Sequence, residues 1–197
     1  MRWDRLFAEL EGRFDQLADE QEAAERADRE RVAIGAVTAI ERLAGALDRQ
    51  VRIGVAGGAV VAGALRAVGP DWLLVVEGEQ RDCVVPWRSV AVVQGLTAAT
   101  GPAPSGLDLR LDLRRALRGL VRDRTPVHVA LAGWTGGGPS ATGGGSGELI
   151  GTIDRVGADF IEVALHAAWE PRRAGAVRSV ALVPLASVLL VRATPLA

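Results

Sequence analysis

The chain has 197 residues, 49% of them hydrophobic, which is enough for one ordinary domain or two small ones with an apolar core. Its formal net charge is −1, from 23 basic and 24 acidic residues, which argues against binding of nucleic acid or acidic membranes through overall charge. Cys83 is the only cysteine, so an intramolecular disulfide and a cysteine-based metal site are both excluded.

Residues 1–31 predict an N-terminal helical arm. Apolar side chains recur there at alternating spacings of four and three, a heptad-like pattern that lasts about three heptads. Two interpretations stay open: the helix packs on its own domain, or it forms a short coiled coil with a second copy. The candidate partner-binding residues of this arm are Trp3, Phe7, Leu10 and Phe14.

The first residues carry charges throughout, which is not typical of a secretory signal peptide. No apolar stretch reaches the roughly 20 residues that a membrane-spanning helix needs. We therefore expect a cytoplasmic protein that does not interact with membranes.

Part of the sequence occurs twice, in residues 63–93 and again in residues 151–191. Each copy has a Gly-x-Asp turn before an aromatic residue, and later the pattern Val-Pro-x-x-Ser-Val. An internal duplication of this kind predicts two similar structural units. The corresponding positions include Gly63 and Gly151, Asp71 and Asp159, Trp72 and Phe160, Pro86 and Pro184, and Ser89 and Ser187.

Short segments rich in Val, Leu and Ile, separated by Gly and Pro, predict five strands in each unit. A helix is expected before each set, over 32–49 and 108–122, and the Gly- and Pro-containing segment 97–106 is expected to be a linker. The glycine-rich segment within 133–147 predicts a flexible loop. The predicted domains are 1–31, 32–96 and 107–197, and the predicted strands are 51–56, 59–67, 71–77, 82–86, 90–94, 127–132, 148–156, 159–166, 177–184 and 188–192.

A helix followed by five short, bent strands resembles the Sm-like small β-barrel, with Gly63 and Gly151 allowing the bend in the second strand. The expected fold class is therefore α+β: an N-terminal helical arm plus two tandem Sm-like five-stranded barrels, each preceded by a helix. The resemblance implies pairing of strand four of one barrel with strand five of a neighbour, which within one chain would give a pseudo-dimer. The RNA-binding signatures of Sm and Hfq proteins have no match in this sequence.

The opening MRWDRLFAELEG, with the rest of this layout, is similar to an uncharacterised actinobacterial family whose members often carry the label Fis family transcriptional regulator. Fis-type proteins end in a helix-turn-helix. This sequence ends instead in the apolar, strand-like segment 180–193, which provides no recognition helix.

The sequence contains no constellation that predicts catalysis. His128 and His166 have no Ser, Cys or carboxylate at an informative spacing. Asp71 and Asp159 suit acid–base chemistry by type, but their Gly-x-Asp context favours a turn in which Asp caps its own backbone. The glycine clusters lack the Gly-Lys-Ser/Thr ending of a phosphate-binding loop. We expect no enzyme activity, no cofactor and no metal.

Arginines recur every four residues in the segment 110–124, which on a helix would form a basic stripe able to contact phosphates. The alternative is a solvated helix face. Tryptophans in turns would suit base stacking or a protein-binding hot spot, or would close the ends of the barrels. The candidate nucleic-acid-binding residues are Arg110, Arg114, Arg115, Arg118, Arg122 and Arg124, and the candidate partner-binding tryptophans are Trp87, Trp134 and Trp169.

The sequence thus favours a non-catalytic interaction or scaffold protein. It would self-associate, or bind a protein partner, through its N-terminal helix or through open strand edges. The alternative is an RNA- or DNA-binding regulator that uses the arginine stripe.

Overall fold

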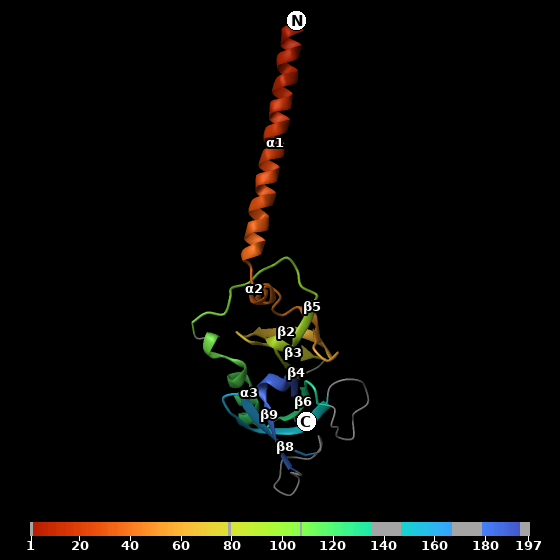
Figure 1. Cartoon of the computed structure of the whole chain (residues 1–197), viewed down its shortest axis with the longest axis vertical. Helices are drawn as coiled ribbons and strands as arrows, with labels where there is room; N and C mark the ends of the chain where they lie inside the picture. The colour runs from red at the N-terminus through yellow and green to blue at the C-terminus, as the bar shows by residue number, and fades with distance from the viewer. Residues whose placement is uncertain (1, 79, 107, 135–146, 167–178, 194–197) are drawn as a thin grey trace. The chain divides into compact units, whose positions relative to one another are not determined.

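The computed structural model describes residues 2–78, 80–106, 108–134, 147–166 and 179–193 (Figure 1). Within α1 the side chains of residues 2–6, 8–11 and 15 are not described. The chain divides into two compact units, Met1–Thr38 and Ala39–Ala197. Residues 135–146 of the predicted flexible loop, and Trp169, lie outside the described residues.

The first unit is one continuous helix, α1 (Arg2–Ala36), whose described side chains are almost all exposed. Side-chain hydrogen bonds one turn apart support it, from Gln16 Nε2 to Glu20 Oε1 at 3.0 Å and from Gln21 Nε2 to Glu25 Oε1 at 3.2 Å. The helix extends five residues beyond the predicted arm, into the segment expected to start a second helix.

The predicted helix over 32–49 is wrong in extent, because this segment is helical only over 32–36, where α1 ends, and over α2 (Ala39–Ala44). A Cβ at Gly45 would lie 2.5 Å from the carbonyl oxygen of Ala99. Position 45 therefore requires a glycine, because segment 97–101 passes close to its backbone. That segment, predicted as a linker, is held by α2. Gly101 N–H donates to Glu41 O at 2.8 Å, and Arg42 Nη1 donates to Ala99 O at 2.9 Å.

Ten strands form one antiparallel sheet in the order β5-β1-β2-β3-β4-β10-β6-β7-β8-β9. Each strand lies where the alternation of apolar residues and turn residues predicts it. The strands are β1 (Gln50–Val55), β2 (Val60–Val68), β3 (Trp72–Glu77), β4 (Arg81–Pro86), β5 (Val90–Gln94), β6 (Pro126–Leu131), β7 (Gly147–Val156), β8 (Phe160–Leu165), β9 (Ser179–Pro184) and β10 (Val188–Ala193).

The predicted fold class, two tandem Sm-like five-stranded barrels, is wrong. The ten strands belong to a single open sheet, because β4 of the first half pairs with β10 of the second half, with Val191 opposite Val84 and Arg192 opposite Cys83. The ends of the sheet, β5 and β9, do not pair with each other in the part of the chain that the structure describes. The pairing of strand four of one unit with strand five of the other, which the resemblance implies, does occur, as β4 with β10. The closure of each set of five strands into a barrel does not occur in the described residues.

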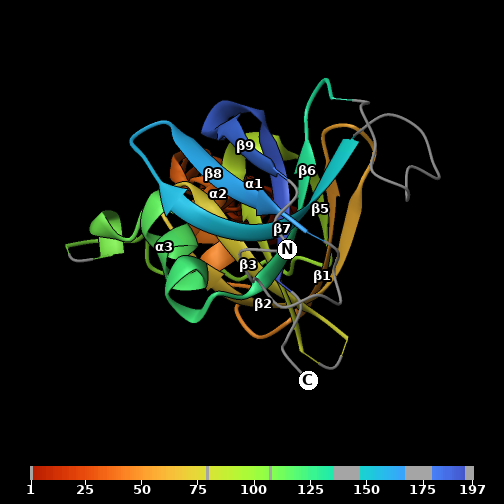
Figure 2. The same cartoon turned by 90° about the horizontal axis from the view of Figure 1, so that it is seen from below.

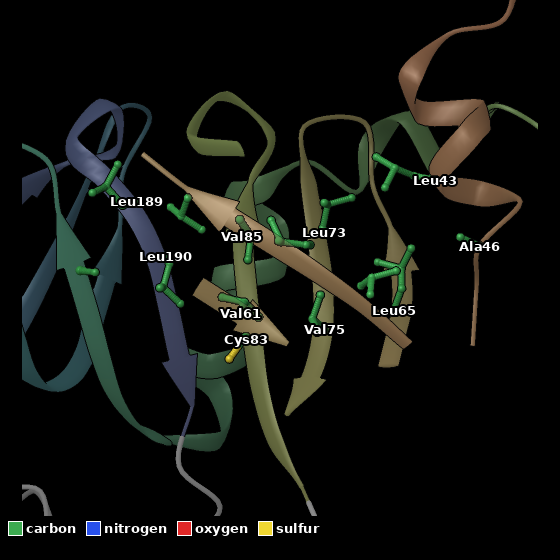
Figure 3. Close-up of a cluster of buried hydrophobic side chains, with 14 residues drawn as sticks. Leu43, Ala46, Val61, Leu65, Leu73, Val75, Cys83, Val85, Leu189 and Leu190 are labelled. Carbon is green, nitrogen blue, oxygen red and sulfur yellow. The ribbon is translucent and has the colours of Figure 1, made fainter. Parts of the chain in front are cut away.

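Two hydrophobic cores meet at this β4–β10 joint, one on each face of the sheet. Val85 and Leu190 belong to the first core, whereas their neighbours Val84 and Val191 belong to the second. Successive side chains of a strand point to opposite faces, so each strand of the joint contributes to both cores. Figure 3 shows Leu190 and Leu189 of β10 beside Val85, Val61 and other side chains of the first core.

Polar contacts also cross the joint. The hydroxyl of Ser89, a buried residue, lies 2.6 Å from the carbonyl oxygen of Leu189. Arg192 Nε donates to Glu77 Oε2 at 3.1 Å, and Cys83 Sγ donates to the same oxygen at 3.1 Å. Burial alone would raise the pKa of Glu77, but the hydrogen bonds from Cys83 and Arg192 outweigh it and lower that pKa. Burial, followed by the Glu77 carboxylate, raises the pKa of Cys83 to about 12.

The helix predicted over 108–122 is divided into a 3₁₀ turn, η2 (Asp108–Arg110), and α3 (Leu113–Asp123). Asp112 caps α3 by accepting a hydrogen bond from Arg115 N at 3.0 Å. Asp71 does not cap its own turn as predicted; its Oδ1 accepts from Leu113 N at 2.8 Å, at the start of α3. α3 then contacts β7, which is drawn as a long bent ribbon in Figure 2.

Candidate interaction surface at the sheet edges

Strand β9 is one open edge of the sheet, with β8 as its hydrogen-bonded neighbour in the described residues. Two large apolar side chains on it are exposed, Leu182 at 63% and Val180 at 57%. An apolar strand whose backbone groups face outward on one side is a surface that pairs readily with another strand. The sequence predicted this strand but gave no sign that it would form an edge.

A cavity of about 380 Å³ adjoins this edge. Its lining is mainly apolar and comes from the ends of β6, β7, β8 and β9. Trp134, which is 47% exposed, contributes one wall, and Leu182 contributes another. The residues that line it include Leu131, Trp134, Leu149, Ala181, Leu182, Val183 and Ser187.

Strand β5 is the opposite edge, with β1 as its hydrogen-bonded neighbour in the described ranges. Ala91, Val92 and Gln94 are exposed there, and Val92 has 51% of its surface accessible. Within the described residues, both ends of the sheet therefore present apolar side chains beside strand backbone that is unpaired on its outer side. This is the arrangement that soluble proteins ordinarily avoid with charged residues, bulges or covering segments.

The candidate partner-binding residues do not gather into one site. Trp134 lies at the cavity, whereas Trp87 is half-buried in a 3₁₀ turn, η1 (Trp87–Ser89), and packs against the first core. On α1, Phe7 is 59% exposed and Phe14 is 70% exposed. Trp3 and Leu10 lie on the same helix, but their side chains are not described.

The candidate arginines are all exposed, but they do not form a single stripe of evenly spaced residues. Arg110 lies on η2, and Arg124 ends α3 with a φ of 50°. The other four lie on α3 within an arc of about 100°, as the rotation of about 100° per residue requires. Arg114 is engaged with the capping residue Asp112, through Nε to Oδ2 at 2.8 Å. The remaining members of this arginine face are Arg115, Arg118 and Arg122.

The two histidines lie on or beside strands of the second half of the sequence. His166 is buried, with Nε2 2.7 Å from Thr152 Oγ1, and His128 Nδ1 lies 3.5 Å from Glu148 Oε1. The described part of the chain contains no group of three or more His, Cys, Asp or Glu residues placed to hold a metal ion. Among the helices with described residues, none combines the length and the apolar character needed to span a membrane.

Comparison of the chain with protein-family models, with curated proteins and with solved structures finds no match. The resemblance to the actinobacterial family with the Fis label therefore stays a prediction.

Proposed function

We propose that this is a non-catalytic cytoplasmic interaction protein that self-associates by strand pairing at the β9 edge of its sheet. The observation that supports this most directly is the exposure of Leu182 and Val180 on an edge strand next to an apolar cavity. A partner strand at β9 would satisfy the outward-facing backbone groups, and its side chains would fill the cavity. Burying apolar surface at about 25 cal/mol per Å² supplies the driving force.

Leu182→Arg is expected to weaken self-association at least tenfold, because it places a charge in the apolar surface that a partner strand must cover. The fold itself should change little, within about 0.5 kcal/mol, since the side chain is exposed. The measurement is sedimentation velocity over a dilution series, comparing this variant with the wild type.

Leu109→Arg is the matched control, because Leu109 is 58% exposed on η2 and belongs to neither edge strand. It should follow the wild-type dilution curve. If Leu182→Arg also follows that curve, the β9 edge is not the self-association surface.

The helix α1 is a second candidate surface for self-association, through the heptad-like positions that include Phe7 and Phe14. Exposed aromatic side chains at this spacing are typical of a helix that packs on a partner helix. Association through α1 would persist in Leu182→Arg. The difference in self-association between Leu182→Arg and the wild type therefore measures the contribution of the β9 edge, separately from that of α1.

The specific observation behind the alternative function, binding of RNA or DNA, is the arginine face of α3. Changing Arg115, Arg118 and Arg122 to Glu should abolish any binding of labelled oligonucleotides that weakens steeply with salt. Changing Arg26, Arg29 and Arg31 of α1 to Glu gives a control of equal charge. Fluorescence polarisation at low and high salt measures both. Absence of binding by the wild type at low salt would exclude this alternative.

A further inference from the structure

The β4–β10 joint shows how an edge of this sheet is covered when it has a partner. By the sequence correspondence, β9 is the counterpart of β4. Val84 of β4 is 4% exposed beneath β10, whereas its counterpart Leu182 is 63% exposed. Pro86 is buried and its counterpart Pro184 is exposed. The second half of the sheet therefore has the same kind of edge as the first half, but without a covering strand in the part of the chain that the structure describes.

The other strand of the joint has an uncovered counterpart as well. β5 corresponds to β10, and Leu190 of β10 is fully buried in the first core while its counterpart Val92 is 51% exposed. Leu189 is 5% exposed, and its counterpart Ala91 is exposed. Each half thus supplies one strand to the internal joint and leaves the matching strand open at an end of the sheet.

The cavity at β9 corresponds to the space that Leu189 and Leu190 occupy in the first half. Those two leucines lie in one core with Val55, Val61, Cys83 and Val85. The counterparts of the latter four residues line the cavity: Leu131, Leu149, Ala181 and Val183.

The sizes of the side chains are complementary. Trp134 and Leu149 in the cavity wall stand where the first half has Gly58 and Val61, so the cavity suits a smaller insert. The strand that would fill it carries Ala91 and Val92 in place of two leucines. Large side chains in the cavity wall are thus matched by small side chains on β5, as close packing requires.

We propose that β9 of one copy pairs antiparallel with β5 of a second copy, in the register of the internal joint. Val93 then lies opposite Leu182, and Gln94 lies opposite Ala181. Val92 enters the cavity, and the Ser187 hydroxyl donates to the carbonyl oxygen of Ala91, as Ser89 does to Leu189. This inference rests on the proposed function and identifies its partner strand.

Such a contact is head to tail, because the two surfaces that meet are different. Each added copy leaves one β5 edge and one β9 edge open, so assembly continues into a chain or closes into a ring. The ionic pair of the internal joint, Glu77 with Arg192, has the neutral counterparts Leu165 and Gln94. Association should therefore be nearly insensitive to salt.

Disulfide cross-linking of the full-length protein tests the register. Gln94→Cys and Ala181→Cys are made singly and together, and they are oxidised under mild conditions. Directly opposite residues have Cβ atoms about 4.5–5.5 Å apart, which permits a bond after small adjustment. The native Cys83 is buried and its pKa is raised to about 12, so it does not compete in the folded protein.

The double variant should give a ladder of cross-linked species on a non-reducing gel. Each single variant should give none, and a mixture of the two single variants should give a dimer. Arg52→Cys mixed with Ala181→Cys is the matched control, because Arg52 is exposed on the inner strand β1. It should give no cross-link. Circular dichroism establishes that every variant is folded.

The possible failures are distinguishable. Cross-linking of Ala181→Cys alone would indicate pairing of β9 with β9, which overturns this inference but leaves the proposed function standing. If the mixed dimer is absent while Leu182→Arg still weakens self-association, then β9 pairs with a strand other than β5. That result also overturns this inference. If cross-links are absent and Leu182→Arg has no effect, both the inference and the proposed function fail.

Discussion

Replacing Gly63 by alanine is expected to lower the free energy of unfolding by about 3 kcal/mol, the upper part of the usual range for overpacking. A Cβ at this position would lie 2.0 Å from the carbonyl oxygen of Val76 and 2.7 Å from its carbonyl carbon. Backbone atoms of the paired strand β3 cannot move aside as a side chain can. The register shifts beside this site, between Leu65 and Ala67, where β2 bends. Urea unfolding followed by circular dichroism measures the effect.

Gly119→Ala is the matched control, because the same substitution there meets nothing within 4 Å. Gly119 lies on the exposed side of α3, where alanine should stabilise the helix by about 0.5–1 kcal/mol. Gly151→Ala should behave like Gly63→Ala, because its Cβ would lie 2.1 Å from Ala164 O. Equal unfolding midpoints for Gly63→Ala and the wild type would contradict this account of the bend.

The positions of the strands could be predicted from the sequence because each strand depends on local chemistry. Alternating apolar residues bounded by Gly, Pro and Asp specify a short strand and its turns without reference to the rest of the chain. Gly63 and Gly151 could be recognised in the same way, because a strand interior disfavours glycine unless another part of the backbone comes close. The structure places a carbonyl oxygen against each of them.

The side-chain contacts between the two halves could not be predicted from local patterns, because they join residues that are distant in sequence. The Arg192–Glu77 ion pair joins residues 115 positions apart, and the Ser89–Leu189 hydrogen bond spans 100 positions. The hydrogen-bond partner of Asp71 was wrongly predicted for the same reason, because Leu113 N is 42 residues away. A turn motif predicts the conformation around the aspartate, but it does not predict which distant N–H group the carboxylate will meet.

The candidate interface was only partly visible in the sequence. Trp134 could be selected because a tryptophan in a turn or loop suits a protein-binding hot spot. Leu182 and Val180 gave no signal, since apolar residues are expected in any strand and only the sheet order makes β9 an edge.

Leu190→Ala is expected to lower the free energy of unfolding by about 2–5 kcal/mol, the range for a fully buried leucine. Leu190 belongs to β10 in the second half of the sequence, yet it packs in the core formed mainly by the first half (Figure 3). Truncating it leaves a cavity at the joint, whereas Leu109→Ala, at an exposed position on η2, should change stability by less than about 0.5 kcal/mol. Differential scanning calorimetry of both variants measures the loss.

The shape of the transition distinguishes one sheet from two independent units. Because Leu190 stabilises the first core while its neighbour Val191 stabilises the second, loss of the joint affects both halves. The residues Ala39–Ala197 should therefore unfold in a single cooperative transition in the wild type, and Leu190→Ala should shift that whole transition to lower temperature. A variant in which one half melts early while the other keeps its wild-type midpoint would show that the β4–β10 joint does not couple them.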